Sequence, residues 1–103
     1  MAKLKIFWAE TALKQRNYIF EYWNKRNGST SYSKKLNSSI VERISLLKTN
    51  PDLGKKTEFT NTRVVSLGHY SILYRRIDSR LIITGFWDNR QNSKELLKFL
   101  TNN

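Results

Sequence analysis

Hydrophobic and polar positions follow two different periods in the first part of the chain. Residues 3–8 form a short apolar run that predicts a strand, and from Ala9 the spacing becomes that of a helix. The helix is predicted over residues 10–27 and ends at Gly28, because glycine adopts positive φ without strain. One helical stripe collects the apolar side chains, interrupted by a single arginine: Ala9, Ala12, Leu13, Arg16, Ile19, Phe20 and Trp23.

A second helix is predicted over residues 31–49. Hydroxyl side chains at positions 29–31 are suitable N-caps, and Pro51 stops the helix because the residue before a proline is pushed out of the helical region. Residues 52–62 are polar and are expected to form a loop. Two helices joined by a short turn predict an antiparallel hairpin, and the stripe of the second one consists of Tyr32, Leu36, Ile40, Ile44 and Leu47.

Three runs rich in β-branched and aromatic residues follow, at residues 63–67, 70–77 and 80–87. The pairs Gly68-His69 and Asp78-Ser79 separate them, and two-residue connections of this kind are typical of tight antiparallel hairpins. The third run, LIITGFW, has no alternation. This predicts a strand that is buried on both faces in the middle of the sheet.

The predicted fold class is α+β, in the order β-α-α-β-β-β with an antiparallel sheet. The helix hairpin packs on one face of the sheet, and Ser93–Leu100 forms a short C-terminal helix. Residues 3–8 must pair with one of the last three strands, since a lone strand leaves its backbone groups unsatisfied. We expect a single domain over residues 1–103, with one sheet face partly open to partners. The side chains expected to be largely buried are Phe20, Trp23, Ile40, Ile44, Ile83 and Phe86.

Composition excludes several classes of protein. The chain has no cysteine and one histidine, so a disulfide framework is impossible and a structural zinc site is not expected. We expect no metal and no cofactor. No apolar run approaches the roughly 20 residues of a membrane span, and the apolar patch near the N-terminus is too short for a secretory signal. A cytoplasmic protein without membrane contact is expected.

The charge balance points to an anionic partner. Nineteen lysines and arginines stand against eight aspartates and glutamates, which gives a net charge of +11. Such an excess favours nucleic acid or an acidic protein through long-range attraction. The planar fork of arginine suits phosphate and carboxylate groups. From residue 63 to 92 every basic residue is an arginine: Arg63, Arg75, Arg76, Arg80 and Arg90.

The strongest candidates for a binding role follow the last strand. Arg90 lies in the polar turn after residues 80–87, where a contact with an anionic target is favoured over a solvated charge. Asp88 is either an acid–base group or a partner of Arg90 that caps the turn. His69 is of the residue type that changes charge near neutral pH. A hairpin tip is usually remote from a site at the opposite strand end, so we expect His69 to be exposed and idle.

Further phosphate-binding candidates lie before and at the start of the second strand. Arg63 either contacts phosphate or pairs across strands with Asp78 or Asp88, and the sequence leaves both open. Lys55 and Lys56 lie nearby in the polar loop.

The order of these segments resembles the RelE/ParE superfamily of small toxins from bacterial type II toxin–antitoxin pairs. The resemblance covers nearly the whole chain. Four segments carry it: WAETALKQRNYIFEYW, LLKTNPDLGKK, SILYRRIDSRLIITGFW and DNRQNSKELLKFL. The last is the most specific, because members often end their final strand in an aromatic-Asp-x-Arg-Gln-Asn turn.

The resemblance implies a toxin that inhibits growth, acts in plasmid stabilisation and is neutralised by a cognate antitoxin. Members act as ribosome-dependent mRNA endoribonucleases or, in the ParE branch, by poisoning DNA gyrase. Nuclease members carry an arginine where this chain has Ser71, and lysines where it has Val64, Val65 and Ser66. They also use a tyrosine or histidine near the C-terminal helix, and neither follows Trp87 here. The resemblance therefore favours DNA gyrase over ribosome and mRNA as the target, and leaves open whether the protein is an enzyme.

A non-catalytic basic module that binds nucleic acid is a further alternative that the charge alone permits. Growth arrest on expression without an antitoxin distinguishes a toxin from such a module.

Overall fold

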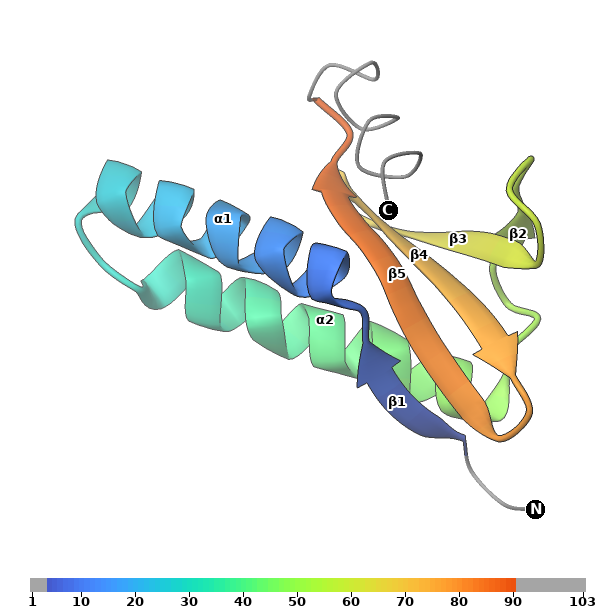
Figure 1. Cartoon of the computed structure of the whole chain (residues 1–103). Coiled ribbons are helices and arrows are strands. Elements are labelled where there is room, and N and C mark those ends of the chain that lie inside the picture. The colour runs from blue at the N-terminus through green and yellow to red at the C-terminus, as the bar shows by residue number, and fades with distance from the viewer. Residues whose placement is uncertain (1–3, 91–103) are drawn as a thin grey trace.

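The elements of the fold follow the predicted order (Figure 1). A computed structural model describes residues 4–90, so the helix expected at Ser93–Leu100 lies outside the described residues. Both long helices have the predicted bounds. The elements are β1 (Lys5–Trp8), α1 (Glu10–Asn27), α2 (Ser31–Thr49), β2 (Lys55–Lys56), β3 (Thr62–Leu67), β4 (Tyr70–Ile77) and β5 (Arg80–Asp88).

Five strands form one sheet in the order β1-β5-β4-β3-β2. The three long strands pair antiparallel, as predicted. β1 pairs with β5, which confirms that it joins one of the last three strands, but the pairing is parallel, from Lys5 opposite Arg80 to Trp8 opposite Ile83. The sheet is therefore mixed, because the chain leaves β1 through the two helices and returns along the other edge of the sheet.

The segment expected to be a polar loop contains the short strand β2. Lys55 pairs with Val64 and Lys56 pairs with Arg63, so β2 covers only the first part of β3. Two lysines have no strand signal of their own. The pairing comes from the exposed edge of β3, which offers backbone partners to the loop that passes it.

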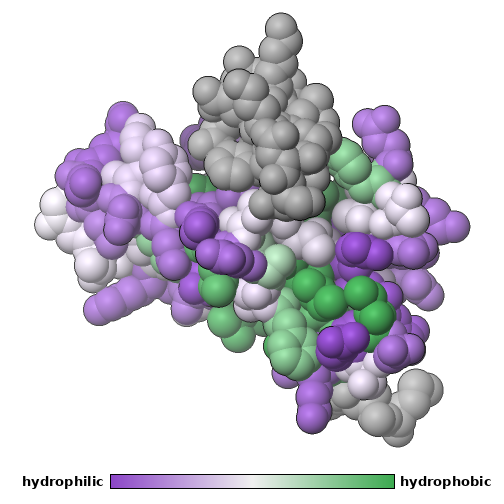
Figure 2. Space-filling view, viewed as in Figure 1, coloured by the Kyte–Doolittle hydropathy of each residue, from purple (hydrophilic) through white to green (hydrophobic). Residues whose placement is uncertain are grey.

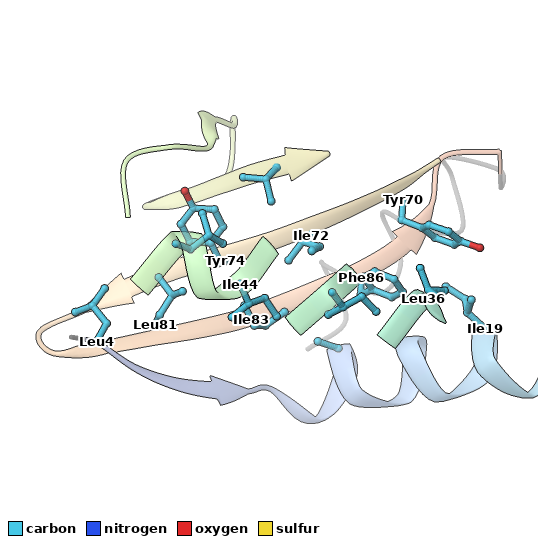
Figure 3. Packing of buried hydrophobic residues seen from close by; sticks show 14 residues of the cluster. Leu4, Ile19, Leu36, Ile44, Tyr70, Ile72, Tyr74, Leu81, Ile83 and Phe86 are labelled. Carbon is cyan, nitrogen blue, oxygen red and sulfur yellow. The ribbon is translucent and has the colours of Figure 1, made fainter. Parts of the chain in front are cut away.

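Both helices lie on one face of the sheet, and the hydrophobic core fills the space between the helices and the sheet (Figures 1 and 3). Four of the six predicted core residues are buried: Ile40, Ile44, Ile83 and Phe86. The prediction is wrong for Phe20 and Trp23, which are only partly buried and pack against the edge of the core. The C-terminal part of α1 extends past the strands (Figure 1), so within residues 4–90 the sheet does not cover its apolar stripe completely there.

The prediction that the LIITGFW run is an interior strand of the sheet is confirmed, whereas the prediction that it is buried on both faces is wrong. β4 holds the centre of the sheet, and β5 lies between β4 and β1. Leu81 and Ile83 are buried against the helices, whereas Ile82 and Thr84 are half-buried. We call the sheet face opposite the helices the open face. Figure 2 shows apolar surface gathered over β1 and β5 on this face, where the Phe7 side chain is 47% exposed.

The outer edge of β5 changes partner halfway along the strand. The backbone N–H of Ala9 donates to the carbonyl oxygen of Ile83 at 2.9 Å, and beyond this point the chain turns into α1. Within the described residues, no strand pairs with this edge of β5 past Ile83. The buried Gln15 side chain of α1 takes over, since its Oε1 accepts the backbone N–H of Phe86 at 2.9 Å. A helix side chain thus satisfies a donor that a strand normally satisfies.

Removal of this acceptor is predicted to destabilise the protein. Gln15→Ala leaves the buried Phe86 N–H unsatisfied, so the free energy of unfolding in urea should fall by about 1–3 kcal/mol. Asn17→Ala changes an exposed amide on the same helix and should alter that free energy by less than about 0.5 kcal/mol. Equal effects of the two substitutions would show that Gln15 does not hold β5.

Candidate functional site

Asp88 and Arg90 form a closed pair at the end of β5. The Asp88 carboxylate accepts the backbone N–H of Arg90 at 2.8 Å, its Nε–H at 2.8 Å, and a further hydrogen bond from Nη2. The Asp88 side chain is 13% exposed and that of Arg90 is 49% exposed. Of the two roles left open for Asp88, the structure therefore contains the pairing that caps the turn.

The pair changes the proton affinity of the carboxyl group. The hydrogen bond from the Arg90 side chain lowers the pKa of Asp88, and partial burial opposes this effect without cancelling it. A carboxylate with a lowered pKa stays ionised at neutral pH and is a weak proton acceptor.

Aromatic and basic side chains of α1 face this pair across a cavity of about 420 Å³, which we call the Arg90 pocket. Two guanidinium groups lie near the Trp23 ring: that of Arg26 at 5.7 Å and that of Arg90 at 5.9 Å from the ring centroid. Both distances allow a cation–π attraction. Arg26 also donates to the Tyr22 hydroxyl at 3.1 Å. The lining residues are Tyr18, Ile19, Tyr22, Trp23, Arg26, Asp88 and Arg90.

A pair of tyrosine hydroxyls lies near the pocket. The hydroxyls of Tyr32 and Tyr70 are 2.9 Å apart, and the Tyr70 ring stacks on Phe86 with centroids 5.4 Å apart. Burial, and after it the hydrogen bond with Tyr32, raises the pKa of Tyr70 well above its usual range. The Tyr70 phenol therefore keeps its proton at physiological pH.

His69 lies nearer to this site than the sequence suggested. Tyr70 at the start of β4 faces Asp88 at the end of β5, so the β3–β4 turn meets the turn that carries Arg90. The carbonyl oxygen of His69 accepts the backbone N–H of Asn89 at 2.7 Å, and the His69 side chain is exposed. The expected exposure is confirmed, but the expected distance from Arg90 is wrong because the antiparallel register places both turns at one end of the sheet.

Arg63 has a partner that the sequence did not suggest. It pairs with neither Asp78 nor Asp88. Its Nη1 donates to the carbonyl oxygen of Gly54 at 2.8 Å, and its Nη2 lies 3.5 Å from the Asp52 carboxylate. Both partners belong to the segment between α2 and β2, which folds back over the start of β3.

A second cavity, of about 340 Å³, surrounds Arg63, and we call it the Arg63 cleft. Lys56 lines it, whereas Lys55 does not, because successive side chains of β2 point to opposite faces. Arg76 joins them from β4. The lining residues are Pro51, Asp52, Lys56, Thr57, Phe59, Asn61, Thr62, Arg63, Tyr74 and Arg76.

The predicted candidates therefore fall into two places rather than one. Asp88 of β5 pairs with Tyr70 of β4, and Arg63 of β3 pairs with Tyr74 of β4. Tyr74 is four residues, or about 13 Å, further along β4 than Tyr70. Asp88 and Arg90 share the first site, and Arg63 and Lys56 share the second.

The sequence interpretation missed Arg26 and Arg76 and treated Trp23 as a core residue only. One signal was available: Tyr18, Tyr22 and Arg26 follow each other at intervals of four, beside the apolar stripe of α1. Nothing comparable in the sequence marks Arg76 as part of a cleft.

Two classes of site have no counterpart among residues 4–90. No group of three histidine, cysteine, aspartate or glutamate side chains lies close enough there to hold a metal ion. In the same part of the chain, no helix has the length and apolar character that a membrane crossing requires.

Comparison with known proteins assigns the family. The family described as the ParE toxin of the type II toxin–antitoxin system parDE matches residues 6–92. The chain therefore belongs to the ParE toxin family, and its expected place in the RelE/ParE superfamily is confirmed. Comparison with curated protein sequences gives no significant match.

Solved structures share the fold. A chain of the chromosomal ParDE toxin–antitoxin system from P. aeruginosa is similar at a TM-score of 0.72 and 19% identity, over 84% of this chain and 96% of that one. A chain of the RelBE2 toxin–antitoxin complex from Mycobacterium tuberculosis is similar at a TM-score of 0.62 and 18% identity, over 84% of this chain and 99% of that one.

The Asp88–Arg90 pair is predicted to stabilise the protein in a pH-dependent way. A lowered pKa in the folded state means that the contribution of Asp88 is complete above its unfolded value of 3.8 and is lost as the pH falls through the folded value. The free energies of unfolding of wild type and Asp88→Asn should therefore differ by a constant amount above about pH 5 and converge below pH 3.8.

Urea titrations from pH 7 down to pH 2 measure this difference, with the exposed turn residue Asp78, changed to Asn, as the control. A difference between wild type and Asp88→Asn that stays constant over the whole range would contradict the pairing.

Proposed function

We propose that this protein arrests bacterial growth in the cytoplasm by poisoning DNA gyrase, and that a cognate antitoxin neutralises it. The observation that carries the proposal is the match of the ParE toxin family over residues 6–92. The two similar structures belong to a ParDE toxin–antitoxin system and a RelBE2 toxin–antitoxin complex, which supports an antitoxin partner here.

The chemistry of the Arg90 pocket supports gyrase poisoning over RNA cleavage. Metal-free cleavage of RNA needs a group that takes the proton of the 2′-hydroxyl and a group that donates one to the leaving oxygen. Asp88 is a weak base because Arg90 lowers its pKa, and the raised pKa of Tyr70 opposes proton release. Ser71, at a position where nuclease relatives carry arginine, is buried, and its hydroxyl donates to the Asn89 side chain at 2.6 Å.

One observation favours the alternative, a ribosome-dependent mRNA endoribonuclease. His69 lies at the same end of the sheet as Arg90, where it is exposed and near Asp88. A histidine is the most common general base or acid in enzymes. On this alternative, transcript cleavage occurs and disappears in a His69→Gln variant.

Expression without the antitoxin distinguishes the candidates. The proposal predicts growth arrest, double-strand breaks in DNA and intact transcripts. Co-expression of the antitoxin should restore growth. Growth without arrest would contradict a toxin and favour the non-catalytic nucleic-acid-binding module. Cut transcripts with unbroken DNA would establish the endoribonuclease.

Arg90 is predicted to contact the target. Arg90→Ala should abolish or strongly weaken growth arrest while changing the free energy of unfolding by less than about 1 kcal/mol, because the side chain is half exposed. Arg90→Lys should restore arrest only in part, since lysine keeps the charge but loses the planar fork. Colony counts after induction and thermal melting curves measure the two effects.

The matched control is Arg80→Ala, which removes an exposed arginine from the other end of β5 and should leave arrest intact. If Arg90 only holds the turn, Asp88→Ala should weaken growth arrest as much as Arg90→Ala does, because either change breaks the pair. Full arrest by a folded Arg90→Ala protein would remove Arg90 from the site.

The antitoxin is predicted to combine acidic residues with apolar anchors. The net charge of +11 attracts acidic residues, and the open face offers the exposed Phe7 ring as an apolar contact. Long-range attraction acts mainly on association, whereas buried apolar contacts set the lifetime of a complex.

The association rate constant should therefore fall about tenfold or more from low to high salt, with a much smaller change in dissociation. Surface plasmon resonance at several salt concentrations measures both constants, and an association rate that does not respond to salt would contradict the electrostatic part of this account.

A further inference from the structure

The Arg63 cleft has three walls that different parts of the chain supply. The segment after α2 contributes Pro51 and Asp52, β2 contributes Lys56, and β3 and β4 contribute Arg63 and Arg76. Figure 1 places β2 on the side of the sheet away from β1, with the segment from α2 leading into it. The cleft thus lies apart from the Arg90 pocket and shares no lining residue with it.

Hydrogen bonds hold the walls of the cleft in place. The Tyr74 hydroxyl donates to the carbonyl oxygen of Pro51 at 2.7 Å and accepts the backbone N–H of Gly54 at 2.8 Å. A Cβ atom at Gly54 would lie 2.6 Å from that hydroxyl, so only glycine allows this close approach. On the other side, the Thr57 backbone N–H and hydroxyl both donate to the carbonyl oxygen of Thr62, at 3.1 and 2.9 Å. A preformed cleft loses little conformational entropy when a ligand binds.

The cleft carries an excess of positive charge. Three cationic side chains, Lys56, Arg63 and Arg76, face one carboxylate, that of Asp52. The Asp52 side chain is 85% exposed and lies against one edge of Arg63 only. Within residues 4–90, neither Lys56 nor Arg76 forms a salt bridge, and the Nε of Arg76 donates to the carbonyl oxygen of Asp78 at 3.4 Å. The Lys56 ammonium and the Nη groups of Arg76 are therefore available to a ligand.

We propose that the Arg63 cleft binds a phosphate group of a nucleic-acid backbone. Lys56 and Arg76 approach from β2 and β4, on opposite sides of Arg63 in the sheet. A phosphodiester has two charged and two ester oxygens in tetrahedral directions, so it can accept hydrogen bonds from both sides at once. A planar carboxylate is the weaker match, because Gly54 and Asp52 already engage the two Nη groups of Arg63 that would form a two-point contact with it.

This binding is independent of the gyrase proposal. A protein that makes such a contact holds any phosphate backbone close to its surface, whatever protein target it acts on. The cleft also accounts for part of the net positive charge, because three of the basic residues gather there on adjacent strands.

The test measures binding of a short labelled DNA duplex by fluorescence anisotropy at several salt concentrations. The Lys56→Gln/Arg76→Gln variant removes the two cations that hold this one phosphate group, so the slope of log affinity against log salt should become shallower by about one unit. Both side chains belong to exposed residues, and circular dichroism confirms that the variant is folded.

The matched control is Lys55→Gln/Arg80→Gln. It removes the same charge from the residue next to Lys56 and from the first residue of β5, and neither residue lines the cleft. Its slope should stay within about half a unit of wild type. Equal slopes for the two variants would show diffuse attraction and overturn the proposal.

A polyglutamate peptide of the same charge as the duplex tests the class of ligand. The proposal predicts that this peptide displaces the duplex only weakly from the wild-type protein. Displacement as effective as that by unlabelled duplex would assign the cleft to an acidic peptide and overturn the assignment to nucleic acid. Growth arrest and DNA breakage test the gyrase proposal separately, so each proposal can fail alone.

Discussion

A hydrogen bond from strand β5 to a side chain of helix α1 holds the helix against the part of the sheet that carries the Arg90 pocket. β5 continues for five residues past Ile83, the last residue with a β1 partner, and at this point the chain leaves the sheet as α1. Gln15 satisfies the Phe86 N–H there, which fixes α1 alongside the second half of β5. Two turns further along α1, Trp23 lies beside the end of β5, where Arg90 approaches its ring. The Arg90 pocket exists because a helix replaces a strand at this edge.

The charged side chains then give the Arg90 pocket and the Arg63 cleft different capacities to bind an anionic group. In the Arg90 pocket, Asp88 occupies two donors of the Arg90 fork, so an anionic group must either share Arg90 or displace Asp88. In the Arg63 cleft, Asp52 and the Gly54 carbonyl engage the two Nη groups of Arg63, whereas Lys56 and Arg76 have no salt-bridge partner within residues 4–90. The open face carries the exposed apolar ring of Phe7. A partner with both acidic and apolar groups fits this distribution, which agrees with the antitoxin proposed for the chain.

Local signals predicted the helices well and the contacts of the charged residues poorly. Gly28 adopts positive φ of 64° and Pro51 follows α2, so both helix ends have the physical causes that were read from the sequence. The partner of Arg63 and the distance of His69 from Arg90 depend on strand register and on a loop that folds back. β2 and the partial burial of Trp23 likewise depend on what lies next to them. Local sequence patterns do not reveal these contacts, because they form between residues that are far apart in the sequence.

The most direct test of this account is the hydrogen exchange of backbone amides along β5, followed by NMR in the wild-type protein. If Gln15 completes the edge of β5, the Phe86 amide should exchange at rates close to those of amides between β4 and β5, although no strand of residues 4–90 pairs with its side of β5. Asp88 lies two residues further along the same edge, because successive residues of a strand alternate between its two edges, and no strand of residues 4–90 pairs with β5 there, so Asp88 makes an internal reference. A Phe86 amide that exchanges as fast as that of Asp88 would contradict the claim that α1 holds the strand carrying the site.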